Sequence, residues 1–219
     1  HRKQFILTPE STEISLGETH YKEFLKKAKI SNNEFYKKIV TRVGKRIAKA
    51  ANKPEYKWEF SVVESKEVNA WCLPGGKIVV YTGIMKLFDN EAELAAVLGH
   101  EVAHAIARHG GERISQGIVL SVIGSAISSL GVKEKDRNKF LAAYSGITTV
   151  GVVLPFSRKH EYEADHIGLI LMAKAGYDPH AALKFWEKMS KLDGKSIEFL
   201  STHPSDKHRI EKIKELLPK

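Results

Sequence analysis

The chain has 219 residues, of which 42% are hydrophobic and 28% charged, with a formal net charge of +9. These proportions are typical of a folded globular protein and exclude a disordered or fibrous one. The excess basic residues lie on predicted helix surfaces among acidic residues, so we interpret them as ordinary solvated surface charge and expect no nucleic-acid partner. Attraction to anionic lipid or to an acidic substrate is favoured over nucleic acid as an alternative. The single cysteine, Cys72, excludes an intrachain disulfide and a cysteine-based zinc site.

The first part of the chain predicts two amphipathic helices. Apolar residues recur at helical spacing over residues 11–29, and every four residues from about 34 to 51. Ser31 and Glu34 have the spacing of a capping box at the start of the second helix. We expect residues 1–55 to form a helical scaffold packed on the rest of the chain, with no chemistry of their own.

A small sheet of about three strands is predicted next. The runs rich in β-branched and aromatic residues are 58–63, 68–73 and 77–82, with a Pro-Gly-Gly turn before the third. The exposed edge of such a sheet can hold an extended peptide as an added strand. The alternative that these strands only cover a helix stays open.

The helix that follows carries the main motif. Asn90 is a predicted N-cap, and strong helix formers continue to about residue 110. Within this helix, His100, Glu101 and His104 form an HExxH motif. Residues four apart are separated by about 40° around a helix, so both histidines can bind one Zn²⁺ while Glu101 acts on a metal-bound water.

Two apolar runs, residues 114–132 and 140–156, come after the motif helix. The first is about as long as a membrane span, at ~20 residues, but contains many Ser and Gly. We therefore favour a buried helical hairpin over the active site, and a shallow contact with lipid stays open as an alternative.

The C-terminal part predicts three further helices. The first covers residues 157–175 and ends at Gly176, a typical helix C-terminus. The second begins after Pro179, and the last follows a turn at residues 201–206. We expect residues 56–219 to form the catalytic domain, within one compact unit overall.

A zinc site needs a third protein ligand. Metzincins place a Gly three residues and a His six residues after the second motif histidine, but those positions hold Ala107 and Gly110. That class is therefore excluded. His109 would lie about 140° around a continuous helix from His104, so we expect it to face away from the metal.

A downstream helix offers a better third ligand. Glu161 and Asp165 are four residues apart and share a helix face, so Glu161 can ligate zinc while Asp165 accepts the Nδ1–H of a ligating histidine. Glu163 lies about 200° around from Glu161 and is expected to be a surface charge. We assign no function to the neighbouring His160 and His166.

In this order, the motifs resemble the family of zinc metallopeptidases that contains the HtpX proteases, the type I CAAX prenyl endopeptidases and the BepA-like proteases. The resemblance extends over about residues 60–215. The matching residues are Asn69-Ala70, Pro74-Gly75-Gly76, Gly83, His100-Glu101 with His104, Ser157-Arg158, Glu161 with Asp165, and His203-Pro204 with Arg209-Ile210. The resemblance implies an α+β, mainly helical zincin-like domain with one Zn²⁺ per chain, held by His100, His104 and Glu161, and Glu101 as general base.

The resemblance also implies functions for residues other than the three metal ligands and the general base. His203 matches a His-Pro motif and would donate a hydrogen bond to the oxyanion, or bind the metal in a latent state. Arg209 would anchor this loop through a carboxylate. The residues expected to contact the substrate are Asn69, Ala70, Gly75 and Gly76.

We expect a zinc-dependent endopeptidase that cleaves unfolded or misassembled cell-envelope proteins. The competing hypothesis is a zinc-stabilised, latent binding or chaperone-like module; Glu101 argues against it, because a structural zinc site needs no base. The chain begins at His1 with no apolar signal, and it lacks convincing transmembrane helices. We therefore expect a soluble bacterial member of the periplasm or envelope, with its signal or lipid anchor missing from this chain and peripheral membrane association left open. The sequence carries no signal for an oligomeric state.

Overall fold

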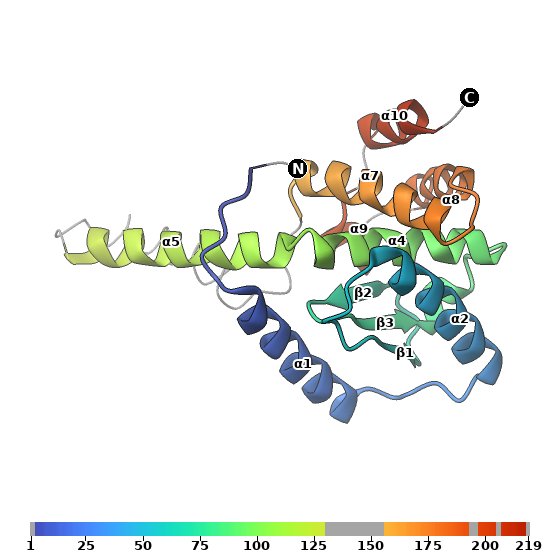
Figure 1. The fold of residues 1–219 in the computed structure, drawn as a ribbon, viewed down its shortest axis with the longest axis horizontal. Coiled ribbons are helices and arrows are strands. Elements are labelled where there is room, and N and C mark those ends of the chain that lie inside the picture. Colours follow the sequence, from blue (N-terminus) through green and yellow to red (C-terminus); the bar gives the residue numbers. More distant parts are fainter. Residues whose placement is uncertain (1–2, 130–155, 193–196, 205–206, 218–219) are drawn as a thin grey trace.

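The computed structural model describes residues 3–129, 156–192, 197–204 and 207–217. These residues form a mostly helical α+β structure around one small sheet, which confirms the predicted fold class (Figure 1). The helices are α1 (Glu10–Lys27), α2 (Glu34–Ala51), α3 (Thr82–Met85), α4 (Glu91–Ile106), α5 (His109–Ser129), α7 (Arg158–Lys174), α8 (His180–Ser190), α9 (Glu198–Thr202) and α10 (Lys207–Leu216). The strands are β1 (Glu59–Val63), β2 (Ala70–Leu73) and β3 (Lys77–Tyr81).

The sheet has the strand order β1-β3-β2. β1 pairs in parallel with β3, and β2 pairs with β3 as an antiparallel hairpin. The hairpin turn contains Gly75 and Gly76 with φ of 85° and 82°, values that glycine adopts without strain. The predicted three-stranded sheet is therefore confirmed, and β2 lies at its edge.

Helix α4 lies between the sheet and the C-terminal helices α7 and α8 (Figure 1). Its residues are buried without interruption from Glu93 to Ala105, as expected of a helix covered on every side. Helix α2 packs against both α4 and β1, and its Val43 and Ile47 belong to the same core as α4. The division of the chain at residue 55 stays a prediction, since these helices share one hydrophobic core.

The start of α2 differs from the predicted capping box. Asn33, not Ser31, is the N-cap, and its side chain accepts a hydrogen bond from the Tyr36 amide at 3.0 Å. Ser31 instead donates its amide to the Val62 carbonyl at 2.8 Å and its hydroxyl to Glu64. Pairing with the end of β1 therefore holds Ser31 outside the helix.

The motif helix begins as predicted but ends earlier. The Asn90 side chain caps α4 by accepting from the Glu93 amide at 3.1 Å. The helix ends at Ile106, and Arg108 has a left-handed φ of 56° before α5 begins at His109. The predicted continuous helix to residue 110 is wrong, because a single left-handed residue redirects the chain.

Helix α5 extends away from the body of the molecule (Figure 1). Ile118 and Val122 on this helix are 41% and 63% exposed, so the expectation of a buried stretch is wrong at these two residues. The remainder of the predicted hairpin, residues 130–155, lies outside the described part of the chain. None of the described helices combines the length and the hydropathy that crossing a bilayer requires.

Candidate metal centre

Four buried side chains converge on the inner side of α4. His100 and His104 come from α4, Glu161 from α7, and His203 from the residue after α9. The His100 Nε2 atom lies 3.1 Å from His104 Nε2 and 3.3 Å from both a Glu161 oxygen and His203 Nδ1. The other Glu161 oxygen lies 3.2 Å from His104 Nε2 and 3.1 Å from His203 Nδ1.

Two glycines let α7 reach this site. A Cβ atom at Gly168 would lie 3.1 Å from the His100 backbone nitrogen, and one at Gly99 would lie 3.0 Å from the Gly168 carbonyl oxygen. The backbones of α4 and α7 therefore touch directly. Glu161 lies seven residues, about two turns, before Gly168 on the same helix face, so this contact brings its carboxylate to the two histidines.

The donor set fits a bound zinc ion. Imidazole nitrogens and a carboxylate are zinc ligands, and bonds of about 2.0–2.1 Å in a tetrahedron leave the donor atoms ~3.3 Å apart. The observed separations of 3.1–3.3 Å between these donor atoms match this spacing. Among the described residues, Glu101 Oε1 is buried without a hydrogen bond and lies 3.4 Å from His203 Nε2. One carboxylate oxygen thus remains available beside the cluster.

Asp165 and Arg209 support the cluster from the side of His100. Asp165 Oδ1 lies 2.9 Å from His100 Nδ1, so it can accept that proton and leave Nε2 free for a metal. Arg209 is 1% exposed; it donates to both Asp165 oxygens at 2.6 and 2.8 Å and forms an ion pair with Glu161 at 2.8 Å. Its guanidinium also lies over the ring of Trp186, 4.0 Å from the centroid.

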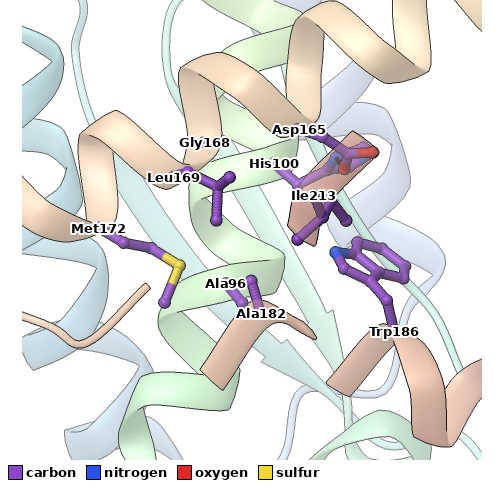
Figure 2. Close-up of a pocket in the computed structure, with 9 residues that line it drawn as sticks. All are labelled: Ala96, His100, Asp165, Gly168, Leu169, Met172, Ala182, Trp186 and Ile213. Atoms are coloured by element: carbon purple, nitrogen blue, oxygen red, sulfur yellow. Dashed lines mark hydrogen bonds and ion pairs between the residues drawn. The ribbon is translucent and has the colours of Figure 1, made fainter. Parts of the chain in front are cut away.

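A cavity of about 10 Å³ lies next to this network, between α4, α7, α8 and α10. Figure 2 shows His100 and Asp165 together on the side of the cavity near Trp186, with Met172 at the far side. This volume suits about one water molecule, so the packing behind His100 is close to complete.

The electrostatics of the site separate its two glutamates. Burial raises the pKa of Glu101 to about 7, and the Glu161 carboxylate adds to this, while His203 and Arg209 oppose it. Burial also acts on Glu161, but the charges of Arg209, His203 and His100 hold its pKa well below the usual range. One carboxyl group can therefore exchange a proton near neutral pH, while the other stays ionised.

The two motif histidines also differ. Burial lowers the pKa of His104 well below its usual value, which keeps the ring neutral and able to bind a metal. Burial and Arg209 also lower the pKa of His100, but Glu161 and Asp165 raise it more, so the net shift is upward. Burial likewise acts against ionised Asp165, and Arg209 outweighs it, so the pKa of Asp165 is lowered.

A second group of buried polar residues, which was not predicted from the sequence, lies beside His104. His109 lies 2.9 Å from His104 by its Nδ1 atom and 3.1 Å from a Glu163 oxygen by its Nε2 atom. His160 stacks on His109 with ring centroids 4.5 Å apart and pairs with Glu112 at 3.1 Å. As predicted, His109 lies on the side of His104 away from the four converging side chains, but it contacts His104 there because the chain turns at residue 108. The expectation that Glu163 is only a surface charge is wrong, since its carboxylate pairs with buried His109. His160 is buried and paired, whereas the neighbouring His166 is exposed.

The residues predicted to contact substrate lie in and before the β2–β3 hairpin; they are Asn69, Ala70, Gly75 and Gly76. A Cβ atom at Gly75 would meet Ile14 of α1, and one at Gly76 would meet the Trp58 ring. These contacts explain the two glycines without a substrate. Asn69 and Ala70 lie at the start of β2, and their contact with a substrate stays a prediction.

Comparison with known proteins agrees with this geometry. Residues 36–217 match Peptidase family M48. The chain is 44% identical over 182 residues to the mitochondrial metalloendopeptidase OMA1 of Schizosaccharomyces pombe, covering 82% of this chain and 52% of that protein. It is 35% identical over 170 residues to human metalloendopeptidase OMA1, covering 74% of this chain and 32% of the relative. It is 27% identical over 207 residues to the β-barrel assembly-enhancing protease of Escherichia coli K12, covering 90% of this chain and 42% of that protein.

The chain thus spans about half or less of the length of these curated relatives. The family match, in contrast, covers most of the chain and includes all four side chains that could hold the metal, His100, His104, Glu161 and His203. It confirms the family resemblance inferred from the motifs: this chain belongs to Peptidase family M48.

Proposed function

We propose that the chain is a zinc-dependent endopeptidase in which His100, His104 and Glu161 hold the metal and Glu101 is the general base. The observation that carries this proposal is the convergence of the four buried donor groups, with a carboxylate oxygen of Glu101 left without a hydrogen bond beside them. The names of the relatives add support, since both OMA1 proteins are called metalloendopeptidases.

Zinc bound at this site would polarise the scissile carbonyl and lower the pKa of a water molecule towards ~7. The buried Glu101 carboxyl group, whose pKa is about 7 in the metal-free chain, would take a proton from the attacking water and give it to the leaving amine. His203 Nε2, 3.4 Å from Glu101, faces the same space and can donate to the developing oxyanion, worth roughly 3 kcal/mol for such donors.

We further propose that the substrate is an extended polypeptide bound along β2. This strand lies at the edge of the described sheet and packs against the metal-binding helix α4. An added strand would receive main-chain hydrogen bonds there, which do not depend on the substrate sequence. Unfolded chains meet this requirement, which supports a function on unfolded or misassembled proteins.

The expected compartment, the bacterial periplasm or envelope, stays a prediction. One relative is a bacterial protease named for β-barrel assembly, which favours an envelope substrate. Other relatives are named as mitochondrial.

A latent form of the same site is the second candidate. His203 Nδ1 lies 3.1 Å from Glu161 and 3.3 Å from His100, close enough to supply a fourth protein donor to a metal. Four protein ligands are typical of structural zinc sites, whereas catalytic sites keep one position for water or substrate. This contact favours a state of low activity in which His203 competes with water.

The test is cleavage of an unfolded protein such as casein by the purified, zinc-loaded chain. We expect cleavage to stop with a chelator and to fall at least ~100-fold in Glu101→Gln, while Glu101→Gln still holds one zinc per chain. Retained activity in Glu101→Gln would contradict the assignment of the base. A wild-type chain without bound zinc would contradict the metal site itself.

His203→Ala separates the two candidates in the same assay. If His203 donates to the oxyanion, this variant loses about 100-fold in kcat at similar zinc content. If His203 blocks the site, cleavage by the variant exceeds that of wild type. A zinc-loaded chain that cleaves nothing, even as His203→Ala, would contradict the endopeptidase proposal.

A further inference from the structure

Behind His104, on the side away from the metal cluster, lies a linear arrangement of three polar side chains. His104 Nδ1 lies 2.9 Å from His109 Nδ1, and His109 Nε2 lies 3.1 Å from a Glu163 oxygen. His109 is fully buried, and the Glu163 side chain is 19% exposed. The series therefore begins at the metal cluster and ends at a carboxylate near the surface.

The proton positions in this series follow from its two ends. His104 Nε2 faces His100 and Glu161, and a neutral imidazole that binds a metal through Nε2 carries its proton on Nδ1. Among the described residues, the partner of His104 Nδ1 is His109 Nδ1, which accepts that proton, so the proton of His109 is on Nε2. There it donates to the Glu163 carboxylate, which accepts hydrogen bonds and donates none.

The chain conformation at residue 108 puts His109 in this position. Arg108 has a φ of 56°, a value that costs a non-glycine residue free energy and that the surroundings must hold in place. The buried Glu13 carboxylate of α1 accepts from Arg108 at 2.8 and 3.2 Å, and Arg108 also donates to the Thr8 carbonyl at 2.6 Å. The helix break that places His109 is thus secured by the N-terminal part of the chain.

The ring of His109 lies beside a second buried imidazole. His160 stacks on it with an interplanar angle of 26°, and Glu112 pairs with His160 at 3.1 Å. Both rings are buried. His160 therefore shares the burial and residue type of His109, and it contacts Glu112, His109, Phe156 and the Ser157 amide.

We propose that His109 is a positioning residue, which with Glu163 sets the tautomer and orientation of His104 for metal binding. This inference rests on the proposed function in that His104 binds zinc. His100 has an equivalent support in Asp165, which lies 2.9 Å from its Nδ1 atom. The two motif histidines are thus each held from behind, one by a carboxylate directly and the other by a carboxylate through a second imidazole.

The test is the zinc affinity of the purified chain, measured by competition with a chromogenic chelator. We expect His109→Phe, which fills the same space without an acceptor, to weaken zinc binding about 10–100-fold. His109→Gln, whose side-chain oxygen can accept from His104, should recover most of the affinity. His160→Phe is the matched control; it keeps a flat ring stacked on His109, removes the pair between His160 and Glu112, and should bind zinc within a few-fold of wild type.

Thermal unfolding of each metal-free variant shows whether it is folded. If His109→Phe does not fold, Glu163→Ala decides, because its partly exposed side chain can be removed at lower cost and should still weaken zinc binding several-fold. The absorption spectrum of the Co²⁺-substituted protein gives a second readout, which should change in His109→Phe and not in His160→Phe.

Wild-type zinc affinity in folded His109→Phe, or in Glu163→Ala if the first variant is unfolded, would overturn the inference. An equal loss of affinity in His160→Phe would also overturn it, since the effect would then be one of packing. These results are independent of the proposed peptidase activity: a wild-type chain that binds zinc but cleaves nothing contradicts that activity alone.

Discussion

Buried charge at the metal cluster is the main feature at the scale of single residues. Glu101, Glu161 and Asp165 are each at most 5% exposed, and Arg209 is the buried guanidinium among them. With all three carboxyl groups ionised, the negative charges outnumber this positive charge. A buried charge without compensation is costly, and a carboxyl group avoids it by staying protonated. Glu101 is the carboxylate that has no arginine partner within hydrogen-bonding distance. This explains why its pKa is raised.

The raised pKa of Glu101 has a consequence for stability that can be measured on the metal-free protein. The pKa of Glu101 is about 7 in the folded chain, compared with 4.5 for the same group in the unfolded chain. The folded state therefore holds the proton more tightly, and this stabilisation is lost as the pH rises from about 4.5 to 7. A shift of this size corresponds to roughly 3 kcal/mol.

Glu101→Gln removes the titrating group and keeps the shape of the side chain. We expect the variant to gain about 2 kcal/mol in free energy of unfolding over wild type when the pH is raised from 5 to 8. Urea unfolding of both metal-free proteins at the two pH values measures this. The same difference between variant and wild type at both pH values would show that Glu101 does not titrate in this range.

At the scale of elements, the contact between α4 and α7 decides whether the cluster assembles. These helices touch through Gly99 and Gly168, where an added Cβ atom would lie within 3.0–3.1 Å of backbone atoms. Both helices are buried at this crossing, so moving either backbone away would disrupt close packing and cost free energy. The helices can approach this closely because Gly99 and Gly168 have no side chains. The same close approach sets the distance from Glu161 to the motif histidines.

Gly168→Ala tests this contact. We expect the free energy of unfolding to fall by about 1–2 kcal/mol, because overpacking outweighs the better helix propensity of alanine. Zinc affinity should fall as well, since Glu161 is carried outward on α7. Chemical unfolding and chelator competition measure the two effects.

Gly110→Ala is the control for helix propensity alone. Gly110 lies in α5, and a Cβ atom there would have no neighbour within 4 Å. This variant should be as stable as wild type, or up to ~1 kcal/mol more stable, with unchanged zinc affinity. Equal behaviour of the two variants would contradict the tight crossing.

The ends of the elements show how far local sequence signals reach. The cap at Asn90 and the helix end at Gly176, which has a φ of 79°, both follow from the preferences of single residues. The end of α4 does not. Arg108 adopts a left-handed conformation that its own residue type disfavours, and it does so because Glu13, distant in sequence, binds its guanidinium.

At the scale of the whole molecule, the proposed metal ligands connect separate parts of the chain. His100 and His104 come from α4, Glu161 from α7 and His203 from the residue after α9. A metal that binds only the folded chain stabilises it, by about 4 kcal/mol at a free concentration of 1,000 times the dissociation constant.

We therefore expect a chelator to lower the melting temperature of wild type by several degrees, and added zinc to restore it. Glu161→Ala should melt at the same temperature with and without chelator under conditions of limiting zinc. Calorimetry or circular dichroism measures both proteins. A wild-type melting temperature that does not respond to chelator would argue against a metal that links these segments.

Residue types at short, regular spacing predicted the motif helix, the three strands, Glu161 as a candidate third ligand and the family. Helix geometry also predicted that His100 and His104 share one helix face and that Glu161 and Asp165 share another, since each pair lies within one helix. The tertiary structure alone decided what surrounds His104. His109 and Glu163 reach it through a helix break stabilised by Glu13, and such a break depends on contacts between residues far apart in the chain, which spacing within a single helix does not record.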